Sequence, residues 1–116
     1  MWVFDTSDET WSEVTVEGDT PDGRRTPWVS VDDDGRGLLM GYGVNGLQAV
    51  NALGDLWHLD LDAARWSRLT PDGDAPPARG FVAALPGAGD VRGMLLGGFD
   101  NSDPVRDLWR LRVSRR

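Results

Sequence analysis

The chain has 116 residues, a formal net charge of −7 and no cysteine. The acidic balance argues against nucleic acid and against an anionic membrane surface as partners, because both are bound through basic patches. Without cysteine the chain cannot form disulfides, thiolate nucleophiles or cysteine-based metal sites.

The N-terminal residues 1–16 hold two short strand candidates, at 2–5 and 10–14, which are rich in aromatic and β-branched residues. Residues 1–5 lack the basic and apolar regions of a signal peptide. No apolar run in the chain approaches the roughly 20 residues that a membrane-spanning helix needs. If Met1 is the true start, we expect a cytoplasmic protein.

Residues 24–70 hold four strand candidates, which are 25–32, 37–43, 55–61 and 65–69. They are apolar on both faces, a pattern that suits a sheet stacked between two others. The run Asp32-Asp33-Asp34-Gly35 lies between the first two and predicts a hairpin turn. The run lacks the spacing of a calcium loop, so we assign no metal site to it.

Residues 79–113 hold three further candidates, which are 80–85, 92–99 and 107–113. A glycine-rich turn at 86–90 separates the first two. His58, the only histidine, has no motif partner for a triad or a metal cluster and is interpreted as a variable packing position. No residue is assigned a catalytic role, and no cofactor is expected.

The whole chain repeats itself at a shift of 55 residues, a period typical of repeat architectures. Nine residues between 2 and 24 recur 55 positions later without a gap, and they are Trp2, Asp5, Trp11, Ser12, Thr15, Gly18, Asp19, Pro21 and Arg24. Residues 38–41 match residues 94–97 at a shift of 56. Residues 55–57 match residues 107–109 at a shift of 52. The loop after the glycines therefore absorbs a length difference.

Both copies share a proline-then-arginine entry, a glycine pair and an Asp-Leu-Trp triplet. In the second copy these are Pro76, Arg79, Gly97-Gly98 and Asp107-Leu108-Trp109, and in the first they are Pro21, Arg24, Gly41-Tyr42-Gly43 and Asp55-Leu56-Trp57, followed by Trp66. This ordered pattern resembles the Kelch repeat of Kelch and galactose-oxidase-like β-propellers. The first copy departs from it where Tyr42 interrupts the glycine pair, and tryptophan replaces the family's usual tyrosine in the third strand.

The resemblance implies an all-β fold of Kelch-type blades, which are four-stranded antiparallel sheets, in a ring that about six or seven blades close. Residues 1–16 would be the last two strands (c and d) of one blade, 24–70 a complete blade, and 79–113 the first three strands (a, b and c) of another. The chain is then a single partial propeller unit with an incomplete ring. We expect a fragment, a truncated remnant of a longer Kelch protein, or one part of a split propeller.

An incomplete ring leaves blade faces and strand edges bare. A complementary propeller fragment would cover them, as would head-to-tail self-association of about three chains. Residues 10–14 could complete the C-terminal sheet of a second copy. Residues 1–5 would then be a surplus strand, which counts against self-association.

The loops between the second and third strands of each blade, 43–54 and 99–106, are polar and differ in length, which favours a contact surface. These loops, the entry arginines and Tyr42, which precedes the first loop, supply the candidate partner-binding residues, which are Arg24, Arg79, Tyr42, Asn45, Gln48, Asn51, Asp100, Asn101 and Arg106. The structural alternatives are that the arginines bond neighbouring loop carbonyls and that the loops are solvated connectors.

The resemblance implies a non-catalytic scaffold that binds a protein or peptide through its b–c and d–a loops. The alternative is a scaffold part of a carbohydrate-binding or galactose-oxidase-like propeller. The copper site of galactose oxidase cannot be transferred, because it uses a cysteine. The recurring tryptophans, Trp2, Trp11, Trp57, Trp66 and Trp109, are expected in the core, and Trp28, which does not recur, is the exception.

Overall fold

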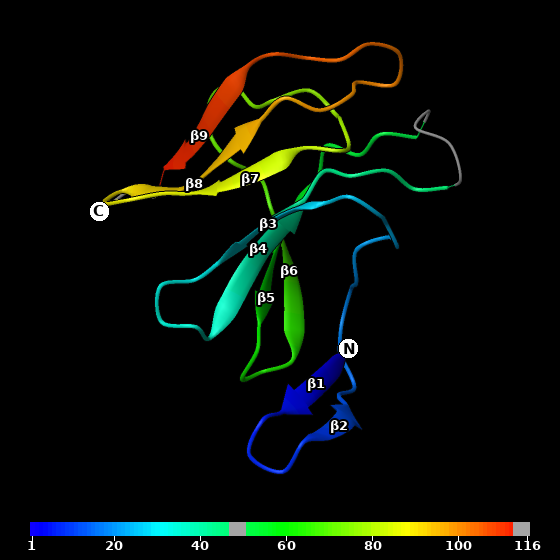
Figure 1. Ribbon diagram of the computed structural model, residues 1–116, viewed down its shortest axis with the longest axis vertical. Helices are drawn as coiled ribbons and strands as arrows, with labels where there is room; N and C mark the ends of the chain where they lie inside the picture. Colours follow the sequence, from blue (N-terminus) through cyan, green and yellow to red (C-terminus); the bar gives the residue numbers. More distant parts are fainter. Residues whose placement is uncertain (47–50, 113–116) are drawn as a thin grey trace.

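The computed structural model describes residues 1–46 and 51–112, and this part of the chain contains nine β-strands and no helix. The strands form three antiparallel sheets (Figure 1). The first sheet is β1 (Trp2–Asp5) and β2 (Thr10–Glu13), and the second is β3 (Trp28–Val31), β4 (Gly37–Gly41), β5 (Leu56–Asp60) and β6 (Arg65–Leu69). The third is β7 (Ala83–Pro86), β8 (Val91–Leu96) and β9 (Leu108–Arg112).

Neighbouring strands in each sheet are also consecutive in sequence, so every sheet is a simple meander. The predicted fold class is confirmed: the protein is all-β, it contains a four-stranded antiparallel sheet like a Kelch blade, and its ring is open. Within the described ranges there is no helix long and apolar enough to cross a membrane.

The first strand of each copy begins later than the sequence pattern predicts, at Trp28 and Ala83. The cause is a residue with left-handed backbone just before each strand, Thr26 with φ of 54° and Phe81 with φ of 57°. Non-glycine residues adopt this region at a steric cost, and it cannot continue a strand. The backbone therefore turns at these two positions before the ladder starts.

The strand register corrects the shift of 56 inferred for 38–41. Trp28 lies opposite Gly41 in the second sheet, and Ala83 lies opposite Leu96 in the third, so Gly41 corresponds to Leu96 at a shift of 55. Tyr42 therefore does not interrupt the glycine pair but occupies its first position, where Gly97 stands in the second copy. Tyr42 and Gly97 both have positive φ, 59° and 66°. Matching glycine to glycine in the sequence paired Gly41 with Gly97 and so misaligned the two copies by one residue.

The hydrophobic core lies between the second and third sheets. Its buried members are Trp28, Leu39, Tyr42, Leu56 and Leu95. Burial of such a cluster removes apolar surface from water and is the main term that holds the two sheets together.

Trp28 is the centre of this interface, which corrects its assignment as the exception. Its indole Nε1 donates to the carbonyl of Met94 at 2.8 Å, and only 3% of the residue is exposed. Ser30 donates to the carbonyl of Arg92 at 3.0 Å beside it. Gly93 makes the close contact possible, because a Cβ there would lie 2.8 Å from the Trp28 ring.

The recurring tryptophans do not all reach the core. Those that are buried or half-buried are Trp57, Trp66 and Trp109, and those that are exposed are Trp2 and Trp11. Trp2 is 61% and Trp11 65% exposed, because no strand of another sheet in the described chain packs against the first sheet. The expectation that they are core residues is wrong for this chain.

The aspartate run closes the β3–β4 hairpin. Gly35 has φ of 70°, and Asp34 accepts a hydrogen bond from the backbone of Arg36 at 2.9 Å.

Asp32 instead binds side chains, accepting from Arg92 of the third sheet at 2.6 Å and lying 2.8 Å from Nε2 of His58. His58 is therefore held by a specific polar partner rather than by packing alone. No group of three or more metal-ligating side chains gathers in residues 1–46 and 51–112.

Candidate functional site

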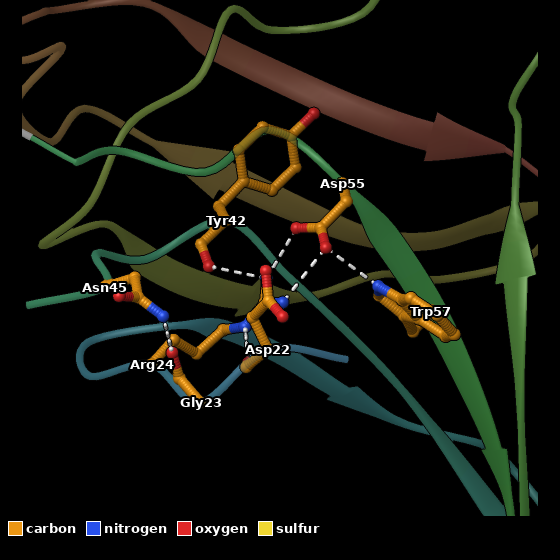
Figure 2. Close-up of polar contacts among 7 residues, drawn as sticks. All are labelled: Asp22, Gly23, Arg24, Tyr42, Asn45, Asp55 and Trp57. Carbon is orange, nitrogen blue, oxygen red and sulfur yellow. Dashed lines mark hydrogen bonds and ion pairs between the residues drawn. The ribbon is translucent and has the colours of Figure 1, made fainter. Parts of the chain in front are cut away.

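The entry arginine of the first copy forms a closed polar network at one end of the second sheet (Figure 2). Arg24 binds Asp55 with both terminal nitrogens, at 2.5 and 2.9 Å. The same guanidinium donates to the carbonyls of Tyr42 and Asp22, each at 3.1 Å. Trp57 donates its indole N–H to Asp55 at 2.8 Å. The network links the entry segment, the end of β4 and the start of β5.

The second copy repeats this network. Arg79 binds both oxygens of Asp107 and donates to the carbonyls of Pro77 and Gly97, at 3.0 and 3.3 Å. Trp109 donates to Asp107 at 2.8 Å, as Trp57 does to Asp55. The Asp-Leu-Trp triplet is therefore a structural motif, in which the tryptophan orients the carboxylate that the arginine binds.

Both arginines are enclosed, with 3% of the Arg24 side chain and 2% of the Arg79 side chain exposed. The hydrogen bond from Arg24 lowers the pKa of Asp55 from its ordinary 3.8 to about 2. The hydrogen bond from Arg79 likewise holds the pKa of Asp107 below its ordinary value. From the sequence these arginines are candidate contacts for a partner. In the structure their contacts are those of the structural alternative, which is bonding of loop carbonyls.

Tyr42 is also buried, with 6% of the residue exposed. Its hydroxyl donates to the carbonyl of Pro76 at 3.2 Å, and burial raises the pKa of that hydroxyl. The side chain therefore ties the first glycine-pair position to the segment between β6 and β7.

The remaining sequence candidates lie on the loops that follow β4 and β8, and these two loops touch. The side-chain oxygen of Asn101 accepts from the backbone of Ala52 at 2.9 Å. Asn45 donates its side-chain amide to the carbonyl of Gly23 at 2.8 Å and its backbone N–H to Asn51. All three asparagines are exposed.

Asp100 lies in a tight turn, in which its carboxylate accepts from the backbone of Asp103 at 3.1 Å. Arg106 is exposed near the start of β9. Gln48 lies outside the described residues. The structure thus brings loop residues of both copies together on one surface, while the arginines and Tyr42 lie beneath it.

The same surface carries an aromatic pair that is absent from the sequence candidates. Phe81 and Phe99 meet edge to face, with ring centroids 6.3 Å apart, and they are 44% and 43% exposed. The guanidinium of Arg25 lies 5.8 Å from the centroid of the Phe81 ring. Thr26 accepts a hydrogen bond from the backbone of Phe81 at 3.1 Å.

A signal for this pair exists in the sequence. At a shift of 55, Phe81 and Phe99 align with Thr26 and Val44 of the first copy, neither of which is aromatic. Each phenylalanine also directly follows a glycine. In the structure, the bridge between Gly80 and Phe99 places the two phenylalanines side by side. We call the surface formed by Arg25, Asn51, Phe81, Phe99 and Asn101 the loop face.

Comparison with known proteins agrees with the blade geometry. The chain is 29% identical over 109 residues to Kelch domain-containing protein 1 of Homo sapiens. The chain is related to Kelch domain proteins. It is also 27% identical over 114 residues to Kelch domain-containing protein 2 of Bos taurus.

The alignments cover 92% and 97% of this chain but only 26% and 27% of the two relatives. The chain therefore spans about a quarter of the length of the curated Kelch proteins that it matches. No family model matches the sequence.

Proposed function

We propose that this chain is a non-catalytic Kelch-type propeller segment that binds a protein or peptide through its b–c and d–a loops. The b–c loops join β4 to β5 and β8 to β9, and a d–a loop joins β6 to β7. The observation that carries the proposal is the exposed Phe81–Phe99 pair with Arg25 against it.

The two exposed rings place apolar area in water, which is unfavourable, and a bound partner would remove that area from water. Aromatic residues and arginine are the side chains that most often dominate protein–protein contacts. Asn51 and Asn101 add exposed amide groups on the b–c loops, which can donate and accept hydrogen bonds at the rim of a contact.

The buried networks beneath support binding by holding the loops in place. Arg24 and Arg79 each tie a loop carbonyl to an aspartate at the start of the next strand. Asn101 links the two b–c loops. A surface that is ordered before binding loses less conformational entropy when a partner arrives.

A peptide-display selection on the immobilised chain tests the proposal. Peptides recovered on the wild-type chain should bind a Phe81→Ala, Phe99→Ala double variant at least about tenfold more weakly, since aromatic contacts of this kind dominate interface energies. The matched control is Val31→Ala on β3, which also removes an exposed apolar side chain, 61% exposed, but lies outside the loop face. Recovery of no binding peptide would contradict the proposal, as would equal affinity for the double variant and the wild type.

A further inference from the structure

The three asparagines of the chain differ in the residue that follows them. Asn45 is followed by a glycine, Asn51 by an alanine and Asn101 by a serine. An asparagine can lose its amide nitrogen without an enzyme when the backbone nitrogen of the next residue attacks the side-chain carbonyl carbon. Glycine favours this attack, because it has no Cβ to shield its nitrogen and its backbone adopts more conformations. Asn45 is therefore the asparagine whose sequence most favours the reaction.

The backbone nitrogens that would attack also differ in the structure. Within the part of the chain that the structure describes, the N–H of Gly46 makes no hydrogen bond. Gly46 has φ of 103°, which residues with a side chain rarely adopt. The N–H of Ala52, in contrast, donates to the side-chain oxygen of Asn101 at 2.9 Å. One hydrogen bond thus occupies the nitrogen that would attack Asn51 and also holds the side chain of Asn101.

Asn45 lies where water reaches it and where its side chain has a structural role. Asn45 and Gly46 are both exposed, whereas Val44 before them is fully enclosed. The side-chain amide of Asn45 donates to the carbonyl of Gly23 at 2.8 Å, next to the network of Arg24 (Figure 2). This bond ties the loop after β4 to the entry segment of the second sheet. Replacing the amide by a carboxylate removes the donor and leaves two acceptors facing each other.

We propose that Asn45 is a site of spontaneous modification, at which deamidation gives aspartate or isoaspartate and releases the loop after β4 from the entry segment. The backbone nitrogen of Gly46 bonds to Cγ of Asn45 while the bond from Cγ to Nδ2 breaks. The proton of the Gly46 nitrogen leaves with Nδ2 as ammonia, and a cyclic imide is formed. Water then opens the imide at either of its two carbonyls. This reaction does not depend on whether the loop face binds a partner.

Peptide mapping by mass spectrometry tests the proposal on the folded full chain. The chain is incubated in mildly alkaline buffer, and the three asparagines are followed in the same sample. Asn45 should convert at least about tenfold faster than Asn51 and Asn101, since only Asn45 precedes a glycine. Isoaspartate should form at Asn45 together with aspartate, because the imide opens at either carbonyl. Asn45→Gln is the matched control, and its longer side chain, which would have to close a larger ring, should stay unmodified.

An aspartate variant tests the structural consequence of the modification. Asn45→Asp should lower the melting temperature by about 4 °C, because the hydrogen bond to Gly23 is lost. Asn51→Asp is the matched control, since it adds the same charge to the same loop and the Asn51 side chain makes no hydrogen bond among the described residues. Its melting temperature should stay within about 1 °C of the wild type, as for an ordinary surface substitution.

Three results would overturn the inference. One is conversion of Asn45 in the folded chain that is no faster than conversion of Asn101. Another is aspartate at position 45 without isoaspartate, because no cyclic imide would then have formed. The third is an equal melting temperature for the wild type and Asn45→Asp, because the modification would then not release the loop.

Discussion

The two copies of the repeat have the same local chemistry in different surroundings. Leu56 and Leu108 occupy the same place in the Asp-Leu-Trp triplet, yet Leu56 is 7% and Leu108 55% exposed. Likewise the Asp55 side chain is 16% exposed and that of Asp107 41%. The difference arises because the third sheet covers one face of the second, whereas no described sheet covers the corresponding face of the third. Local motif and burial are therefore separate properties of a blade.

The largest expected contrast is between the two leucines. Leu56→Ala should lower the free energy of unfolding by about 3 kcal/mol, through lost burial and a cavity in the core. Leu108→Ala removes a side chain that is already in water and should cost less than about 1 kcal/mol. Urea unfolding followed by tryptophan fluorescence measures both. Equal losses would show that the two faces are covered alike.

The arginines should give a smaller contrast in the same direction. Arg24→Ala leaves Asp55 and the carbonyl of Tyr42 without their donor and should cost about 2 to 3 kcal/mol. Arg79→Ala should cost less, because the more exposed Asp107 regains water when its partner is lost. Urea unfolding of the two variants measures the difference, and a larger loss for Arg79→Ala would contradict it.

The pH dependence of stability should separate the two aspartates. The folded-state pKa of Asp55 lies below its ordinary 3.8, at about 2. The pairing therefore stabilises the fold above pH 4, and this contribution is lost as pH falls from about 4 to about 2. It amounts to about 2 kcal/mol. Asp55→Asn should flatten the stability profile in this range, and Asp107→Asn should flatten it less. Identical profiles for wild type and Asp55→Asn would contradict the assignment.

The smallest contrast concerns the first glycine-pair position. Gly97→Ala places a Cβ at φ of 66°, 3.2 Å from the carbonyl oxygen of Val105, and should cost about 1 to 2 kcal/mol. Gly23→Ala is the matched control, since a Cβ there has no neighbour within 4 Å. Thermal unfolding of the two variants checks the difference. No loss for Gly97→Ala would show that a Cβ at this left-handed position carries no strain.

The sequence predicted the strands well because each copy repeats the same turn residues, proline, glycine and aspartate, between its strands. The sequence did not predict which side chains are buried and which are exposed, because burial depends on neighbours in space. Trp28 does not recur but is the most enclosed tryptophan of the core, while the recurring Trp11 is exposed. Phe81 and Phe99 were missed because they are 18 residues apart in sequence and meet only across a bridge. Repetition identifies a blade, and only the packing of sheets identifies its core and its surface.

The central claim is that the second and third sheets pack face to face through Trp28, and a double-mutant cycle between Trp28 and Leu95 tests it most directly. Both residues are 3% exposed and lie in one cluster, but they belong to different sheets. The free energies of unfolding of Trp28→Ala, Leu95→Ala and the double variant should give a coupling of about 1 kcal/mol or more, as expected for residues in contact. Additivity within about 0.3 kcal/mol would show that the two residues do not touch and would contradict the packing of the two blades.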